Sequence, residues 1–399
     1  MNTQTKGLCE KPAVRPEDAR FSSGPCKKHP GWDLTNFLTH NLGRSHRASV
    51  PKARLNEAIT RSAKILGLPD DWHLAIVPAS DTGAFELALW SMLGERGVDV
   101  FTWESFSSDW ANDIQNQLKI DDLNIYTANY GELPDLNLTK ADRDTIFVFN
   151  GTTSGVRVPN MDWVPAEREG LAFCDATSAA FAMELDYSKL DVVTWSWQKV
   201  LGSEGGFGML ALSPAAVNRL ETFQPDRPLP KIFRVTKKGK LDSALFKGAT
   251  INTPSMLALE DLHSALDWAE SIGGLQALIQ RSQNNFTVID EWVSKSDWID
   301  WLPVDPATRS TTSMCLKITS AEFLNLSDDE QSSAVKQMCA WLAEEDVAYD
   351  IAAYRSAPTG FRLWGGATVE SSDLEKLTVW LDWAYARWFN ETVNAGESK

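Results

Sequence analysis

The chain has 399 residues, an apolar content of 43% and a formal net charge of −16 at neutral pH. This length suffices for two domains of ordinary size, each with its own core. The acidic balance argues against a surface that binds nucleic acid, because phosphate backbones attract basic faces. No apolar run reaches the ~20 residues of a membrane helix, and the first seven residues lack the apolar stretch of a signal peptide. The five cysteines form no C-x-x-C pair, which is typical of reduced thiols, so we expect a cytoplasmic protein.

The pattern of the chain suggests three parts. Residues 1–20 are polar and contain two prolines, which predicts a flexible or loosely docked N-terminal arm. Residues 21–270 alternate between strand-like and helix-like runs and are expected to form a large domain. Residues 271–399 mix shorter strands with helices, which predicts a smaller C-terminal α+β domain.

In the large domain, the predicted helices and strands alternate along the chain. Helices are expected at 51–66, 85–93 and 110–118, and strands at 72–77, 98–103, 122–127, 145–150, 171–174, 192–195 and 207–212. This alternation predicts an α/β fold with a mostly parallel sheet that is covered by helices on both faces. In such sheets, ligands bind at the carboxyl ends of the strands.

A long helix is expected from 255 to about 278, kinked or interrupted near Gly273-Gly274 and resuming to 292. In the smaller domain we expect strands at 312–318, 348–351 and 360–364, and helices at 327–344 and 371–389.

Two neighbouring strands of the predicted sheet end in ionisable residues. Asp175 closes the run 171–174, and Lys199 follows the run 192–195. Taken singly, a strand-end aspartate is usually a turn residue and a lysine is usually solvated. Together they would deliver a carboxylate and an amine into one cleft. Pyridoxal phosphate chemistry needs that pair, because the amine forms a Schiff base with the cofactor aldehyde and the carboxylate keeps the pyridine nitrogen protonated.

Further strand-end turns carry groups suited to a phosphate. Ser80-Asp81-Thr82-Gly83 lies where a strand passes into a helix, and free amides at a helix start bind phosphate, although Asp81 could simply cap the helix. Asn150 opens a second polar turn that contains Thr152.

Basic residues gather at a few places in this acidic chain. Arg44, His46 and Arg47 precede the first predicted strand and suggest an anion site, with surface charge as the alternative. A basic stretch at 231–247 is either a solvated loop or a loop near an anionic ligand.

The segments resemble those of phosphoserine aminotransferases, a family of fold-type-I, class-V pyridoxal-phosphate enzymes, over nearly the whole chain. The most specific parts are Phe21-Ser22-Ser23-Gly24-Pro25, Ser45-His46-Arg47, Gln198-Lys199 and Asn252-Thr253-Pro254. The resemblance implies a homodimer that binds pyridoxal 5'-phosphate and exchanges amino groups between phosphoserine and 2-oxoglutarate in serine biosynthesis. It leaves open a side activity on a related substrate of vitamin B6 biosynthesis.

Carried over position by position, the resemblance implies roles for individual residues. Lys199 would be the Schiff-base lysine, Asp175 the partner of the pyridinium nitrogen, and Trp110 the aromatic that stacks on the ring, with Trp103 or Phe106 as the fallback. Ser80, Asp81, Thr82 and Gln198 match phosphate-binding positions, and Thr152 lies near the ring hydroxyl. Asn252 and Thr253 would reach the cofactor phosphate from the second subunit. Arg362 would grip the substrate α-carboxylate, and His46, Arg47 and Arg355 would bind the substrate phosphate. No metal is implied.

Two features depart from the family pattern and suggest a divergent subgroup. Ser-Asp-Thr-Gly replaces the usual glycine-rich phosphate turn, and Tyr354 stands where a histidine is usual. One alternative is another small-amino-acid aminotransferase, such as a serine–glyoxylate type, and another is a non-catalytic binding protein of the same fold. A cysteine desulfurase fits less well, because Cys315 and Cys339 fall in a strand-like and a helical segment rather than a loop.

Overall fold

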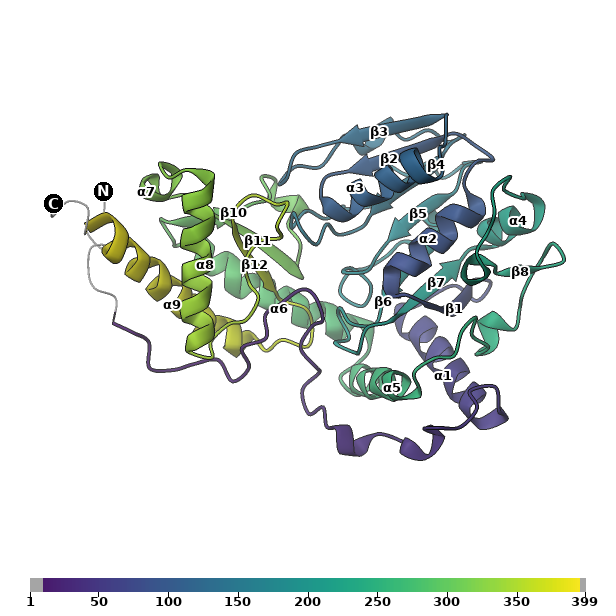
Figure 1. Ribbon diagram of the computed structural model, residues 1–399, viewed down its shortest axis with the longest axis horizontal. Helices are drawn as coiled ribbons and strands as arrows, with labels where there is room; N and C mark the ends of the chain where they lie inside the picture. Colours follow the sequence, from purple (N-terminus) through teal and green to yellow (C-terminus); the bar gives the residue numbers. More distant parts are fainter. Residues whose placement is uncertain (1–9, 395–399) are drawn as a thin grey trace.

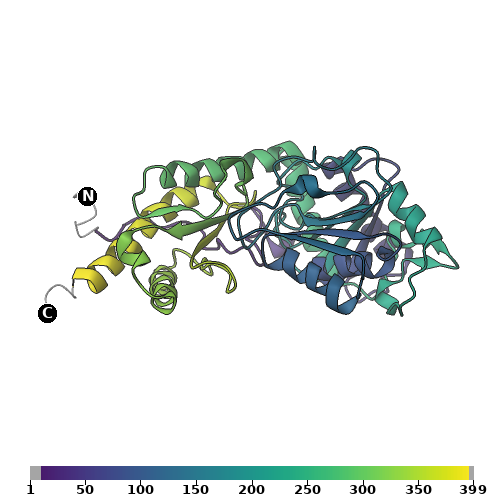
Figure 2. The ribbon, with the colours of Figure 1, turned by 90° about the horizontal axis from the view of Figure 1, so that it is seen from above.

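The computed structural model describes residues 10–394 and has two lobes joined by a long helix (Figures 1 and 2). The larger lobe contains α1 (Ser49–Leu66), β1 (His73–Pro78), α2 (Ser80–Met92), β2 (Val98–Thr102), α3 (Ser105–Asn112), β3 (Leu123–Thr127), β4 (Asp144–Val148), β5 (Ala172–Asp175), β6 (Val192–Ser196), β7 (Phe207–Leu212), α4 (Pro214–Thr222), β8 (Thr236–Lys237), β9 (Lys240–Leu241) and α5 (Met256–Ser271). The linking helix and the smaller lobe contain α6 (Leu275–Val293), β10 (Ile299–Trp301), β11 (Ser313–Ile318), α7 (Ala321–Leu324), α8 (Asp328–Glu344), β12 (Gly360–Trp364) and α9 (Ser371–Phe389).

The central sheet of the large lobe has seven strands in the order β1-β7-β6-β5-β4-β2-β3. Strand β7 pairs antiparallel with both β1 and β6, whereas the pairs from β6 to β3 are parallel. All strands except β7 therefore run the same way, and their carboxyl ends meet at one edge. The predicted α/β fold with a mostly parallel sheet is confirmed.

Fully buried strands explain why the sequence showed continuous apolar runs instead of alternation. Every residue of β2, β4, β5, β6 and β7 is buried, as expected when helices cover both faces of a parallel sheet. Helix α2 lies across β6 and β7, and α3 packs against β2 and β4 (Figure 1). Packing of α2 and α3 against these strands therefore holds the starts of the two helices near the carboxyl edge of the sheet.

The smaller lobe is built on the antiparallel sheet β10-β11-β12, with α8 and α9 packed beside it. The chain from residue 10 to 20 runs along this lobe, where Trp380 Nε1 donates to Val14 O at 2.8 Å. Lys11 and Arg15 both pair with Glu345. This part of the expected N-terminal arm therefore has specific partners, while residues 1–9 lie outside the described residues.

Three local expectations differ from the structure or are sharpened by it. Residues 348–351 form no strand; Tyr349 and Ala352 make single bridges on either side of Asp350, which takes a left-handed backbone with φ of 55°. The helix expected at 110 begins at Ser105, since the Glu104 side chain caps it. The long helix predicted from 255 is interrupted at Gly273 and Gly274, both with positive φ, and continues as α6.

The basic stretch at 231–247 contains the hairpin β8–β9 on the surface. Lys240 pairs with Glu221 at 2.7 Å and Lys237 pairs with Asp242 at 2.5 Å. Acidic neighbours thus neutralise these exposed lysines, which favours the solvated loop over an anion site. None of the helices within residues 10–394 is both long enough and apolar enough to cross a membrane.

Candidate active site

Side chains from five strand ends and two helix starts surround one pocket at the carboxyl edge of the sheet. The pocket encloses about 560 Å³ of space, part of it open to solvent. Its lining comprises Ser80, Asp81, Thr82, Glu104, Phe106, Trp110, Val148, Asn150, Thr152, Asp175, Thr177, Ser196, Gln198 and Lys199. Eight of the residues singled out from the sequence as cofactor-binding are in this list, which is the convergence expected from parallel strands.

Lys199 follows β6 and is buried, with 8% of its surface exposed. Its Nζ donates a hydrogen bond to the Ser23 carbonyl oxygen. Burial lowers the pKa of Lys199, and the nearby positive charge of Arg362 lowers it too. Within residues 10–394, Lys199 makes no ion pair. A lysine of this kind can act as a nucleophile or a base near neutral pH.

Asp175, at the end of β5, is held by two donors. Trp110 Nε1 donates to Oδ2 at 3.1 Å, and the Thr177 amide donates to Oδ1 at 3.0 Å. The Trp110 ring packs against Phe85, with 4.9 Å between the ring centroids. Trp110 lines the pocket and its indole also orients the Asp175 carboxylate, and its stacking on the cofactor ring stays a prediction.

Phe106 offers the more accessible aromatic face in the pocket. It lies in the first turn of α3, lines the pocket and is only half-buried. Trp103, the other fallback, is almost completely buried, and its Nε1 donates to Val156 O. Phe106 therefore stands beside Trp110 as a candidate for the residue that would stack on a bound ring.

The start of α2 provides the groups expected to bind a phosphate. Ala79 and Ser80 have left-handed backbones, with φ of 68° and 59°, and no side chain caps the helix. The first amides of this helix are therefore free for an anion. Gln198 Nε2 donates to Ser80 Oγ at 2.9 Å, which joins the start of α2 to the residue beside Lys199.

Close backbone contact beneath this turn requires a glycine. A side chain at Gly208 of β7 would collide with the Ser80 carbonyl oxygen. Glycine at this position therefore lets β7 run directly beneath the turn.

Thr152 lies in the turn after β4. Its Oγ1 donates to Ser178 Oγ at 2.9 Å, and Ser178 Oγ in turn donates to the Asn150 carbonyl oxygen. This small network fixes the turn at the rim of the pocket.

Glu104 is a pocket residue that the sequence analysis missed. It is 2% exposed, and its carboxyl accepts from the Ser107 amide at 2.7 Å and from Thr153 Oγ1 at 2.8 Å. The carboxyl therefore ties the start of α3 to the turn after β4. Burial raises its pKa to about 7. The sequence signal that could have revealed Glu104 is the capping pattern Glu-x-x-Ser at 104–107. This signal is weak, because a shorter polar residue than Glu is more common at the position that caps a helix.

Arg362 and Arg355 approach the pocket from the smaller lobe. Arg362 lies on β12, its Nε is buried without a partner, and its charge acts on Lys199. Both guanidinium groups lie over the Tyr354 ring, at 5.6 and 5.8 Å from its centroid. Tyr354 contacts Phe106, with 6.0 Å between ring centroids. The loop that carries Tyr354 thus stands beside the pocket.

Like Arg355 and Arg362, the other predicted residues do not line the pocket of their own chain. His46 and Arg47 lie just before α1, and Asn252 and Thr253 lie just before α5. His46 is buried with Nε2 unpartnered, whereas Arg47, Asn252 and Thr253 are exposed.

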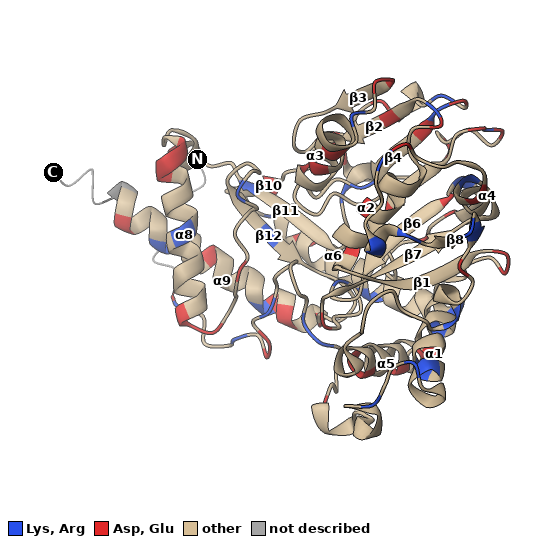
Figure 3. Cartoon of the chain, turned by 45° about the vertical axis from the view of Figure 1, so that its right-hand side comes forward, with Lys and Arg blue, Asp and Glu red and all other residues tan. Residues whose placement is uncertain are grey.

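Ion pairs between α1 and α5 show that the two helices run parallel. Arg54 pairs with Glu260 at 2.7 Å, and about two turns farther along α1 Arg61 pairs with Asp267 at 2.6 Å and Glu270 at 3.0 Å. Figure 3 shows basic positions on α1 beside acidic positions on α5. The starts of both helices therefore lie at the same end of the pair, and both predicted sets lie there together.

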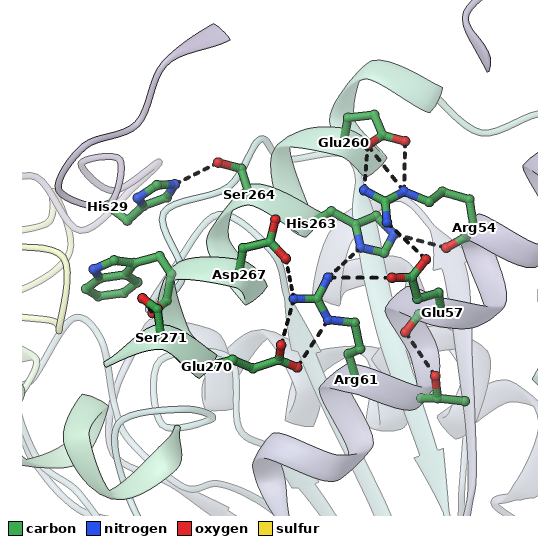
Figure 4. A network of polar contacts seen from close by, with 12 residues as sticks. His29, Arg54, Glu57, Arg61, Glu260, His263, Ser264, Asp267, Glu270 and Ser271 are labelled. Carbon is green, nitrogen blue, oxygen red and sulfur yellow. Dashed lines mark hydrogen bonds and ion pairs between the residues drawn. The ribbon is translucent and has the colours of Figure 1, made fainter. Parts of the chain in front are cut away.

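A buried histidine completes this network (Figure 4). His263 is fully buried, its Nδ1 lies 3.0 Å from Arg61 Nη1, and its Nε2 lies 3.0 Å from Arg54 O. Because arginine can only donate, Nδ1 is the acceptor and the proton is on Nε2. Burial lowers the pKa of His263, which keeps the ring neutral between two cations.

The pocket fits pyridoxal phosphate by the chemistry of its unpartnered atoms. Asp81 Oδ1, Thr177 Oγ1, Ser196 Oγ and Gln198 Oε1 are buried without hydrogen-bond partners, and such atoms are rare unless a ligand or water satisfies them. An uncapped helix start, a lysine and an aspartate complete the set. Within residues 10–394 there is no cluster of three or more potential metal ligands.

Comparison with known proteins identifies the family. No family model matches the chain. A phosphoserine aminotransferase of Methanosarcina barkeri is 55% identical over 375 residues, which cover 94% of this chain and 99% of that protein. The chain belongs to the phosphoserine aminotransferase family. The resemblance inferred from the sequence is thereby confirmed.

Solved structures extend this likeness to the fold. A phosphoserine aminotransferase from Bacillus circulans subsp. alkalophilus has a TM-score of 0.74 at 20% identity and covers 93% of this chain and 99% of that one. A ureidoglycine-glyoxylate aminotransferase from Bacillus subtilis has a TM-score of 0.71 at 13% identity, with 94% of both chains covered. Enzymes with different substrates share this fold, so substrate choice must depend on individual side chains.

Replacing Glu104 with Gln should flatten the dependence of stability on pH. Because the pKa of Glu104 is about 7 in the folded protein and 4.5 ordinarily, the folded state holds a proton that the unfolded chain has lost between these values. Stability is therefore lost as the pH rises through this window, by up to about 3 kcal/mol. The measurement is the free energy of unfolding from about pH 5 to pH 8 for both proteins.

The matched control is Thr153→Val, which removes a hydroxyl that favours the ionised carboxyl but leaves Glu104 titratable. The stability of this variant should still fall as the pH rises, but over a window that lies at higher pH. An unchanged pH dependence in Glu104→Gln would contradict the assignment.

Proposed function

We propose that this chain is a pyridoxal-phosphate-dependent aminotransferase of cytoplasmic serine biosynthesis. It would convert 3-phosphohydroxypyruvate and glutamate into O-phosphoserine and 2-oxoglutarate. The observation that carries the proposal is the meeting of buried Lys199 and Asp175 in a pocket rich in unpartnered polar atoms. Membership of the phosphoserine aminotransferase family supports the choice of substrate. The four cysteines among the described residues are free, which agrees with a reducing compartment.

The residues around the pocket divide into groups that would hold different parts of the cofactor. Asp175 would keep the ring nitrogen protonated, Phe106 would lie against the ring face, and Thr152 would lie near the ring hydroxyl. The free amides of α2, with Ser80, Thr82 and Gln198, would bind the phosphate. When bound, pyridoxal phosphate supplies an aldehyde that captures an amine and a ring that accepts electrons.

Lys199 would move the proton that transamination requires. Burial and Arg362 lower the pKa of its amine, which favours the unprotonated form of Nζ. In this state Nζ can take the proton from the α-carbon of the substrate and later return a proton. The hydrogen bond to the Ser23 carbonyl oxygen holds Nζ at the pocket wall.

Arginines without acidic partners would bind the substrate anions. Among the described residues, neither Arg362 nor Arg355 forms an ion pair. Arg362 Nε is buried without a hydrogen-bond partner, which costs free energy of folding unless a ligand supplies the partner. Arg362, beside Lys199, suits the α-carboxylate, which arginine binds with two parallel hydrogen bonds. Arg355 lies farther out on the loop and suits the distal phosphate of phosphoserine or the γ-carboxylate of glutamate.

A second copy of the chain would supply the remaining anion-binding groups. His46 and Arg47 lie with Asn252 and Thr253 at one end of the α1/α5 pair, outside their own pocket. Large apolar side chains nearby are exposed, namely Leu34, Leu38, Leu42, Val50 and Leu257. Exposed apolar residues grouped in this way are typical of an interface. We therefore propose a homodimer in which this surface reaches the pocket of the partner.

The substrate assignment is tested by comparing phosphoserine with serine as amino donor to 2-oxoglutarate. Purified holoenzyme should form glutamate rapidly with phosphoserine and at least about tenfold more slowly with serine, because only the former engages the distal cations. Lys199→Ala serves as the control and should form no glutamate. Equal rates with both donors would retain an aminotransferase but reject the phosphoserine assignment.

Arg47→Ala should weaken the use of phosphoserine selectively. Losing one charge-assisted contact costs about 1.5–3 kcal/mol, so KM for phosphoserine should rise roughly ten- to hundredfold. KM for glutamate should rise less, since its carboxylate carries a smaller charge. Lys64→Ala, which removes a charge at the opposite end of α1, is the matched control and should leave both KM values unchanged. Equal effects of Arg47→Ala on both substrates would reject a role in phosphate recognition.

A further inference from the structure

Two carboxyl groups lie side by side at the floor of the pocket. Asp81 comes from the first turn of α2 and Asp175 from the end of β5. They are 6% and 7% exposed, and both line the pocket. Two acids buried in one place need either cations or a shared proton.

The Asp175 carboxylate accepts hydrogen bonds from nitrogen donors, whereas the Asp81 carboxyl accepts none from a nitrogen in the described part of the chain. The indole of Trp110 and the amide of Thr177 donate to the two oxygens of Asp175. By strict hydrogen-bond geometry Asp81 Oδ1 has no partner, yet the Asp81 carboxyl lies close enough to interact with Asp175, Thr177 and Thr194. The hydroxyls of Thr177 and Thr194 are themselves buried without partners. Asp81 is thus surrounded by groups that can accept a hydrogen bond as well as donate one.

The charges around the pair favour one proton on Asp81. Among the described residues, neither carboxyl forms an ion pair. The facing ionisable groups are Lys199 after β6, the Cys174 thiol of β5 and Glu104 at the start of α3. Burial, and then the charge of Asp175, raises the pKa of Asp81 well above its usual value. Two adjacent buried carboxyls repel each other when both are ionised, which favours a proton on one of them.

Asp81 can serve a phosphate through its backbone amide, at the uncapped start of α2, without using its side chain. An ionised carboxylate would repel a phosphate dianion, and the free amides of α2 already suit that group. The Asp81 side chain instead faces Thr194 of β6 and the residues that follow β5. Its contacts are therefore on the side of Asp175.

We propose that Asp81 is a positioning residue that stays protonated and donates a hydrogen bond to Asp175, so that the pair presents a single negative charge to the cofactor ring nitrogen. This inference rests on the proposed function for the identity of that nitrogen. The donated bond stabilises ionised Asp175, which no cationic side chain within residues 10–394 pairs with. Trp110, Thr177 and Asp81 would then all donate to one carboxylate.

The first test is infrared spectroscopy of the holoenzyme at about pH 8, well above the usual ionisation range of a carboxyl. The C=O stretching band of a protonated carboxyl should be present, should be lost in Asp81→Asn and should persist in Glu104→Gln. Glu104 is the matched control because it is the other buried carboxyl with a raised pKa in the pocket. A band that is absent, or that survives in Asp81→Asn, would overturn the proposal. This readout does not depend on which amino donor the enzyme uses.

The second test uses the sign of a shift in the pH profile. Removing the donor in Asp81→Ala should leave the Asp175 carboxylate with one hydrogen bond fewer, so the acid limb of kcat/KM should move to higher pH by about one unit, equivalent to roughly 1.4 kcal/mol. Asp81→Asn keeps a donor and should restore the wild-type limb, with cofactor affinity within about threefold. A shift to lower pH in Asp81→Ala would mean that an ionised neighbour had been removed, which rejects the proposal. Absence of phosphoserine turnover in the wild type would refute the proposed function instead, and the infrared result would still decide the state of Asp81.

Discussion

The parallel course of β4, β5 and β6 is the constraint on which the site depends. Parallel neighbours end at the same edge, so Asn150, Asp175 and the residues after Ser196 reach one place without any long-range signal in the sequence. The antiparallel strand β7 then brings Gly208 beneath the turn at Ser80. The backbone therefore places the functional groups, and local hydrogen bonds decide how each one points.

Charged side chains without an ion-pair partner connect the structure with the proposed chemistry. Most buried ionic groups are paired, as in the contact of Arg219 with Asp144 at 2.8 Å in the core. Lys199 and Arg362 have no such partner within residues 10–394, and Asp175 is stabilised by neutral donors. Leaving charges unpaired is costly for folding, and it is expected where a cofactor and an anionic substrate supply the missing partners.

Sequence reasoning predicted the sheet, the pocket and its two central residues because each depends on local pattern. Apolar runs revealed the buried strands, and the ionisable residue after each run indicated the edge. Contacts between distant segments could not be predicted in this way. The indole of Trp110 reaches Asp175 from another element, and the burial that raises the pKa of Glu104 exists only once α3 has packed. The strand expected at 348–351 is absent because Asp350 has a left-handed backbone, which no pattern in the amino-acid sequence indicated.

The most direct test of a site shared between two copies is subunit complementation. Lys199→Ala and Arg47→Ala chains, carrying different affinity tags, would be coexpressed, and the dimer bearing both tags would be purified and assayed with phosphoserine. If Arg47 acts in the pocket of its partner, each mixed dimer contains one intact site and should show about half the wild-type activity, whereas both parent homodimers are impaired. Mixed dimers no more active than the Arg47→Ala parent would mean that Arg47 serves its own chain, which would contradict the account.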